Sequence, residues 1–192
     1  QGKVMESYFS EEDEDIEDIV RIYNKIHERE EQGLLATGWI RDIYPTGDTA
    51  AVSVAKGEMY VLVDNDEVVA AARINQEQGE EYRRAAWKYN AEDEDVMVLH
   101  TLVVLPESSG KGYGRAFVEF YEKHASANNC HYLRMDTNAR NKAARSLYKF
   151  LGYEESDIVP CEFNGIKDVD LVCLEKKLDI ACIGKKFATE TL

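Results

Sequence analysis

Three glycines at alternate positions, Gly110, Gly112 and Gly114, follow a stretch rich in Val and Leu. An amphipathic pattern begins directly behind them, so the sequence predicts a buried strand, a glycine turn and a helix in that order. Glycine has no Cβ, so several backbone N–H groups of such a turn can face a ligand, and the positive end of the helix dipole adds to them. This arrangement suits the binding of a phosphate or pyrophosphate.

The spacing of the glycines excludes two nucleotide-binding fingerprints. A nucleotide P-loop requires Gly-x-x-x-x-Gly-Lys-Ser/Thr, whereas Lys111 is followed by Gly112, and Leu105 stands where the first glycine should be. A dinucleotide fingerprint requires Gly-x-Gly-x-x-Gly, and its third glycine would fall at Arg115 or Phe117. For this stretch taken alone, a tight strand-to-helix turn without a ligand is the alternative.

A second motif follows downstream and reads Asn-x-x-Ala-x-x-Leu-Tyr-x-x-Leu-Gly-Tyr over residues 141–153. Its apolar positions share one helical face, and Gly152 is a natural helix end. Together the two motifs resemble the signatures of the GNAT superfamily of N-acetyltransferases, in the family's order. The family usually begins the glycine loop with Gln or Arg, where this chain has Ser109. The resemblance extends from the first expected strand to Lys177.

The resemblance implies a mixed α/β (α+β) fold of the GNAT acyl-CoA N-acyltransferase type. The expected architecture is a bent mixed sheet of six or seven strands with about four helices, in which strands four and five splay apart. Residues 1–178 are expected to form this single domain, and residues 179–192 a C-terminal tail without a strong pattern. Splaying leaves backbone groups unpaired, and the arm of an acyl-CoA can bond them as a surrogate strand.

Acetyl-CoA is the co-substrate that the resemblance implies, and no metal is expected. The backbone of strand four should bond the pantetheine arm, the glycine loop should hold the pyrophosphate, and Asn141 should bond the pantetheine. The full set of expected cofactor-binding residues is Leu102, Val103, Val104, Ser109, Gly110, Lys111, Gly112, Tyr113, Gly114, Arg115, Asn141, Ala144 and Tyr148.

The implied chemistry is direct acetyl transfer to an amine, without a covalent enzyme intermediate. The amine must be neutral to attack, so a general base is needed, and the departing thiolate benefits from a proton. Tyr148 is the expected general acid. Two residues compete as the base: His100, which alternation places on one side of strand four with Val98 and Leu102, and Asp136 at the end of strand five. For both, a purely structural role is the alternative.

The acceptor is expected to be a primary amine of a small molecule. Trp39 and Tyr44 are candidate substrate contacts, with the anchoring of a surface loop as the equally weighted alternative. An acetyltransferase of proteins or peptides is the second hypothesis, and an acyl-CoA-binding sensor without turnover is the third. The polar insertion Gln76–Asp95 favours a more closed site than a peptide groove, and it is a candidate substrate lid.

Composition narrows the range of partners. The formal net charge of −14 argues against nucleic acid and against an anionic membrane, and it is compatible with a cationic amine. No apolar run is long enough to cross a bilayer, no signal peptide is expected, and the four cysteines form no Cys-x-x-Cys pair, so a cytoplasmic protein is predicted. Family members often dimerise, which leaves a homodimer open. The positive charges expected to serve an anionic cofactor are Lys111, Arg115, Arg140, Lys142 and Arg145.

Hydrophobic periodicity predicts the elements that must position these residues. Strands are expected at Val4–Phe9, Met59–Val63, Glu67–Ile74, from Val96 onward, at Cys130–Asp136, Glu154–Phe163 and Asp168–Lys176. Helices are expected from an N-cap at Ser10 to about Glu31, at Thr49–Lys56, behind the glycine turn, and ahead of Gly152. The segment Gln76–Asp95 should form a long hairpin connection or a short extra helix.

Overall fold

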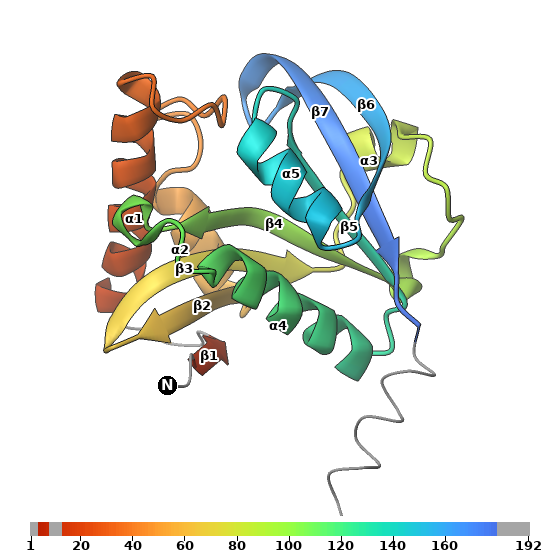
Figure 1. Cartoon of the computed structure of the whole chain (residues 1–192), viewed down its shortest axis with the longest axis horizontal. Helices are drawn as coiled ribbons and strands as arrows, with labels where there is room; N and C mark the ends of the chain where they lie inside the picture. Colours follow the sequence, from red (N-terminus) through yellow and green to blue (C-terminus); the bar gives the residue numbers. More distant parts are fainter. Residues whose placement is uncertain (1–3, 8–12, 180–192) are drawn as a thin grey trace, which may run out of the picture.

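A computed structural model describes residues 4–7 and 13–179 of the chain (Figure 1). The expected helix cap at Ser10, the last residues of the first expected strand and the tail beyond Asp179 lie outside the described residues. The sheet has seven strands in the order β1-β2-β3-β4-β5-β7-β6. Neighbouring strands are antiparallel, except that β4 and β5 run parallel.

The strands are β1 (Val4–Ser7), β2 (Met59–Asp64), β3 (Glu67–Asn75), β4 (Val96–Val104), β5 (Tyr132–Asn138), β6 (Glu154–Phe163) and β7 (Ile166–Lys177). The α-helices are α1 (Asp13–Glu31), α2 (Gly47–Ala55), α3 (Glu80–Arg84), α4 (Tyr113–Ala127) and α5 (Lys142–Phe150). The expected mixed α/β fold is confirmed. The helix beyond the expected four is the single-turn α3, which is the short extra helix offered for the insertion. None of the helices within 13–179 has the length and apolarity that a bilayer crossing requires.

Two layers of helices cover the sheet. Helices α4 and α5 lie in front of it and α2 behind it in Figure 1. The core on the α4–α5 face is built around Phe117, Tyr121 and Leu133, whereas the core on the α1–α2 face is built around Ile19, Ile22 and Met59. Helices α1, α2 and α4 each bury an apolar face against the sheet, as their periodicity predicts.

Strands β4 and β5 pair only over their first halves. Their parallel ladder runs from Val96 opposite Tyr132 to Leu99 opposite Met135 and then stops. Beyond that point β4 stays paired with β3, and β5 stays paired with β7, so the two strands diverge from their common end (Figure 1). The predicted splay of strands four and five is therefore present.

A β-bulge at Thr101 lies where the splay begins. Along this ladder β3 advances from Ala71 to Arg73 while β4 runs from Val103 back to His100, so β4 carries one extra residue. Thr101 has a φ of 55°, which is an outlier for a β-branched side chain. The bulge reverses the alternation of β4. The expectation that Leu102 shares a side with Val98 and His100 was therefore wrong.

The side chains beyond the bulge follow the reversed pattern. Leu102 and Val104 pack against the α4–α5 core, whereas Val103 and Leu105 belong to the α1–α2 core. Val98, which precedes the bulge, belongs to a third cluster together with residues of β6 and β7. A strand with unbroken alternation would have placed Val98 and Leu102 together.

Candidate active site

A cavity of about 1130 Å³ lies between the diverging halves of β4 and β5. Both sequence motifs contribute to its walls. The predicted site residues that line it are Trp39, Tyr44, His100, Leu102, Val103, Val104, Ser109, Gly110, Gly112, Tyr113, Gly114, Arg115, Asp136, Asn141, Ala144 and Tyr148. Lys111 is the one predicted site residue that does not line the cavity.

The glycine loop leads from β4 into α4 and forms one end of the cavity. Gly110 and Gly112 both have a φ of 80°, a left-handed conformation that favours glycine. Gly112 is the N-cap of α4, so the first N–H groups of the helix follow it directly. A Cβ on Gly114 would lie 3.2 Å from Leu147 Cδ2, so glycine there allows α4 and α5 to approach each other. The loop has the geometry of an anion seat.

Asn141 caps the helix that carries the second motif. Its Oδ1 accepts a hydrogen bond from the backbone N–H of Ala144, at 3.2 Å. The cap uses the amide oxygen, so the Nδ2 group is the part of the side chain suited to donate to a ligand in the cavity.

The basic residues near the two motifs do not all line the cavity. Arg115 lines the cavity and forms an exposed ion pair with Glu119 at 3.2 Å. Arg145 instead donates through Nε and Nη2 to the carboxylate of Glu155, at 2.8 Å each. This paired geometry is the strong form of an Arg–carboxylate contact. Arg145 therefore ties α5 to β6.

Tyr148 projects from α5 into the cavity and is otherwise buried. Its ring packs edge-on against Tyr153, with centroids 6.4 Å apart. Burial raises the pKa of Tyr148, and the nearby Asp136 raises it further. The phenol thus keeps its proton at neutral pH, as a proton donor must.

Asp136 directly follows the part of β5 that pairs with β4, and it lines the same cavity. Tyr82 of α3 donates a hydrogen bond of 2.6 Å to its Oδ2 atom. Burial raises the pKa of Asp136 to about 6, although the bond from Tyr82 opposes that rise. At neutral pH this carboxylate is ionised and more basic than an ordinary aspartate, which suits proton abstraction.

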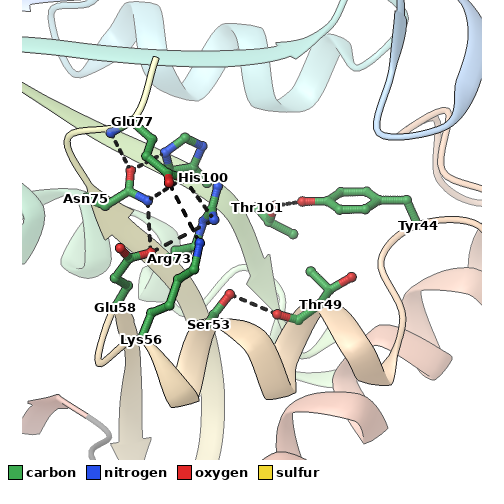
Figure 2. Close-up of polar contacts among 10 residues, drawn as sticks. All are labelled: Tyr44, Thr49, Ser53, Lys56, Glu58, Arg73, Asn75, Glu77, His100 and Thr101. Carbon is green, nitrogen blue, oxygen red and sulfur yellow. Dashed lines mark hydrogen bonds and ion pairs between the residues drawn. The ribbon is translucent and has the colours of Figure 1, made fainter. Parts of the chain in front are cut away.

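His100 is held in one tautomer by its neighbour on β3 (Figure 2). Its Nε2 lies 2.6 Å from Asn75 Oδ1, while Asn75 Nδ2 donates to Glu58 at 2.9 Å. Because the amide nitrogen faces a carboxylate, the amide oxygen faces the imidazole, and Nε2 must carry the hydrogen. Burial and then the charge of Arg73 lower the pKa of His100 to about 3. Of the two candidate bases, the surroundings favour Asp136.

Trp39 and Tyr44 line the cavity from the loop between α1 and α2. Their rings meet edge-on with centroids 6.2 Å apart. The Tyr44 hydroxyl is hydrogen-bonded to the Thr101 hydroxyl at the bulge (Figure 2). The two aromatic residues thus anchor the loop and also present surface to the cavity, so both roles considered from the sequence have a structural basis.

The comparisons with known proteins agree with this architecture. The model of the acetyltransferase (GNAT) family matches residues 13–153. The chain belongs to the GNAT acetyltransferase family. A stretch of 73 residues is 30% identical to an uncharacterized N-acetyltransferase of Methanocaldococcus jannaschii, covering 38% of this chain and 32% of that protein. The match therefore spans about a third of the length of that curated relative.

Solved structures of other GNAT proteins share the fold at low sequence identity. A GNAT acetyltransferase of Streptococcus agalactiae superposes with a TM-score of 0.75 at 18% identity, over 93% of this chain and 97% of that one. A protein of Salmonella typhimurium, solved with acetyl-CoA as its cofactor, superposes with a TM-score of 0.64 at 19% identity, over 93% of this chain and 95% of that one. The ribosomal-protein-S18-alanine N-acetyltransferase of Escherichia coli superposes with a TM-score of 0.62 at 17% identity, over 93% of this chain and 95% of that one.

Tyr82 of this GNAT protein also lines the cavity, although the sequence did not single it out as a site candidate. It was visible only as one of a few large apolar anchors in a charged insertion. The insertion is held firmly: buried Glu175 accepts from the backbone N–H groups of Lys88 and Tyr89 at 2.7 and 3.0 Å. Arg134 also donates to the Tyr89 carbonyl at 2.8 Å. The anchored segment places the Tyr82 hydroxyl against the carboxylate of the candidate base.

Replacing Tyr82 with Phe should move the lower limb of the kcat/KM–pH profile upward by about one pH unit. The hydrogen bond from Tyr82 lowers the pKa of Asp136, whereas burial and the charge of Glu81 raise it. When the hydrogen bond is removed, the pKa of Asp136 should therefore rise further. The other titratable side chains whose charge couples to Asp136 are Tyr44, Tyr148, Cys161 and Cys173.

A matched control for this change is Tyr89→Phe. Tyr89 lies in the same insertion but does not line the cavity, so its variant should leave the pH profile in place. If Tyr82→Phe lowered the rate equally at every pH, Tyr82 would serve packing alone.

Proposed function

We propose that this protein transfers an acetyl group from acetyl-CoA to a primary amine of a small molecule by direct attack. The observation that carries the proposal is the presence of Asp136 and Tyr148 in one cavity, electrostatically coupled to each other. One is a carboxylate of raised pKa and the other a phenol that keeps its proton. A general base and a general acid are the two groups that such a transfer requires.

Acetyl-CoA fits the part of the cavity between β4 and α5. The edge of β4 that turns away from β5 offers backbone groups at Leu102 to Val104, and these need hydrogen-bond partners. At Gly110 an added Cβ would meet open space, so the loop leaves room for a ligand there. When bound, acetyl-CoA would supply the acetyl thioester. Asn141 Nδ2 and the N–H groups that begin α4 are placed to bind it.

Two residues of this chain, Asp136 and Tyr148, would each carry out one of the two proton transfers. Asp136 accepts the proton that the attacking amine must lose, through its Oδ1 atom, because Oδ2 is bonded to Tyr82. Attack forms the new C–N bond, and Tyr148 then gives its proton to the sulfur as the C–S bond breaks. The two transfers leave the protein with Asp136 protonated and Tyr148 ionised, and solvent exchange restores both.

The acceptor side of the cavity is bridged, which favours a small acceptor over a polypeptide. The turn between β6 and β7 contacts the α1–α2 loop so closely that a Cβ on Gly165 would lie 3.3 Å from Ile43 Cγ2. The same loop lies against the end of β5, where a Cβ on Gly38 would lie 2.3 Å from Asn138 Nδ2. These contacts close a ring of chain around the acceptor side, and an extended peptide needs an open groove.

The likeness to a ribosomal-protein acetyltransferase supports the peptide acceptor as the second candidate function. Release of free thiol from acetyl-CoA should be measured across small amines, N-terminal peptides and lysine peptides. Turnover with small amines at rates well above those with peptides is the expected result. Turnover restricted to peptides would replace the proposal with the second candidate. Binding of acetyl-CoA without any turnover would identify a sensor.

Tyr148→Phe should lower kcat by about 100-fold or more, since it removes a general acid. The affinity for acetyl-CoA should change by less than about twofold, because the ring and its packing remain. Isothermal titration with acetyl-CoA and steady-state rates would check both statements.

Tyr153→Phe is the matched control for Tyr148→Phe. The Tyr153 hydroxyl is buried without a hydrogen-bond partner within the described part of the chain, and Tyr153 does not line the cavity. Its variant should keep the wild-type rate. An unchanged kcat in Tyr148→Phe itself would remove the acid role from this residue.

A further inference from the structure

We propose that the acceptor is a lipophilic primary amine, with a bulky aliphatic or aromatic body and no anionic group. This inference rests on the proposed function, because it names the class of substrate for the same site. Three features of the acceptor side support it: the charge of Asp136, the pairing of the arginines in the cavity wall, and the apolar surface around them.

Asp136 is a carboxylate without a cationic partner. Across the ion pairs that residues 13–179 form, none includes Asp136. Its one hydrogen bond from a side chain comes from the neutral Tyr82. A largely buried carboxylate is costly unless a positive charge compensates it. The ammonium group of an incoming amine supplies that charge on binding; it loses one proton to solvent to become the neutral nucleophile, and Asp136 takes the second proton during the transfer.

The arginines of the acceptor side of the cavity wall already form ion pairs with carboxylates of the protein. Arg73 lies 3.4 Å from Glu77 and 3.9 Å from Glu58, as Figure 2 shows. Arg83 is 3.0 Å from Asp93. Arg29 reaches Glu107 at 4.0 Å. A substrate carboxylate would have to compete with these pairs and would meet Asp136 and Glu81 as like charges. An acceptor that carries an anionic group is therefore disfavoured.

One wall of the cavity near Asp136 is apolar and comes from four elements: α3, the α1–α2 loop, β6 and β7. The residues of this wall belong to one packed hydrophobic cluster, and Tyr82 of α3 is one of its buried members. The other members of this cluster that line the cavity include Trp39, Tyr44, Phe163, Ile166, Val169 and Leu171. A chamber that combines an unpaired carboxylate with one broad apolar wall favours a ligand with an amine at one end and an apolar body.

The mouth of the acceptor side extends this apolar surface outward. Leu34 and Leu35, which follow α1, line the cavity and are 63% and 38% exposed. Large apolar side chains at the rim of a cavity indicate contact with a ligand. The body of the acceptor would cover these two side chains while its amine reaches Asp136.

A series of linear amines tests the inference through steady-state kinetics with acetyl-CoA. Lengthening the chain from propylamine to hexylamine should lower KM by at least about tenfold, because each buried methylene is worth about fourfold in affinity. 2-Phenylethylamine should be used well, and ethanolamine, spermidine and glutamate poorly. A KM that is independent of chain length, or a preference for spermidine or glutamate, would overturn the inference.

Variants at the mouth test where the apolar body lies. The double variant Leu34→Gln/Leu35→Gln should raise KM for hexylamine about five- to tenfold, with kcat and acetyl-CoA affinity unchanged. Ile158→Gln is the matched control, since Ile158 is 46% exposed on β6 and does not line the cavity. An equal KM in the double variant and the wild type would place the body of the substrate elsewhere.

Binding measurements separate this inference from the proposed function. Hexylamine and propylamine would be titrated calorimetrically into the protein saturated with CoA, where no transfer can occur. Tighter binding of hexylamine without any acetylation in the kinetic assay would reject the proposed function while confirming that the site selects lipophilic amines. Acetylation of both amines with equal binding would keep the proposed function and reject the inference.

Discussion

Asp136→Asn is expected to lower kcat/KM for acetyl transfer by about 10² to 10⁴ and, at the same time, to make the protein more stable at neutral pH. The loss of rate follows from the removal of the proposed general base. Asparagine is nearly isosteric, and its Oδ1 can still accept the hydrogen bond from Tyr82. The variant therefore removes the charge and the proton acceptor while leaving the local contact in place.

The gain in stability follows from the sign of the pKa shift. The pKa of Asp136 in the folded protein, about 6, lies above its ordinary value of 3.8. The folded state therefore holds this proton more tightly than the unfolded state, and stability decreases as the pH rises from about 4 to about 6. Above pH 6 the cost is fully present and amounts to at most about 3 kcal/mol. Asparagine does not ionise and avoids this cost.

Thermal unfolding and steady-state rates would check the two effects together. The difference in Tm between Asp136→Asn and the wild type should be small at pH 4 and should reach several degrees at pH 7. His100→Gln is the informative comparison, and it should keep the lower limb of the pH–rate profile. If that limb were lost in His100→Gln and retained in Asp136→Asn, the base would be His100.

Gly110→Leu is expected to weaken acetyl-CoA binding by about 100-fold. A side chain at this position would project into open space at the glycine loop, where the pyrophosphate is proposed to lie. Loss of two hydrogen bonds to a charged group, at about 1.5 kcal/mol each, corresponds to this factor. Isothermal titration with CoA would measure it.

Gly33→Leu provides a matched control for the backbone effect of that change. Gly33 has a φ of 73° against 80° for Gly110, and at both positions an added Cβ meets nothing within 4 Å. Gly33 does not line the cavity. Both variants should lose similar conformational stability, and only Gly110→Leu should lose affinity for CoA. Equal affinity in the two variants would contradict the assignment of the pyrophosphate seat.

The fold and the local geometry of the residues proposed to bind the cofactor could be predicted from the sequence because they rest on local patterns. The glycine turn follows from Gly110 and Gly112, which adopt the left-handed conformation that glycine permits. The cap at Asn141 and the end of α5 near Gly152 follow from helix signals within a few residues. Two such motifs in the family's order also predicted the splayed strands.

The contacts that build the acceptor side could not be predicted, because they join distant segments of the chain. Tyr82 and Asp136 are separated by 54 positions in the chain, and no local pattern links them. The pairing of His100 with Asn75 similarly depends on the register of β3 against β4. Nor does a threonine within an apolar run signal a bulge, since its positive φ is imposed by tertiary context.

The bulge at Thr101 divides β4 into two segments of opposite phase, and this has a consequence for how the protein can change. Residues up to His100 orient their side chains by one alternation, and residues from Leu102 onward by the other. On β4, His100 lines the cavity before Thr101, and Leu102 to Val104 line it after Thr101. Substitutions at these two places can therefore change different parts of the cavity wall without reorienting each other's side chains. A single strand thus offers two independently adjustable surfaces, which suits a fold that keeps one donor while changing its acceptors.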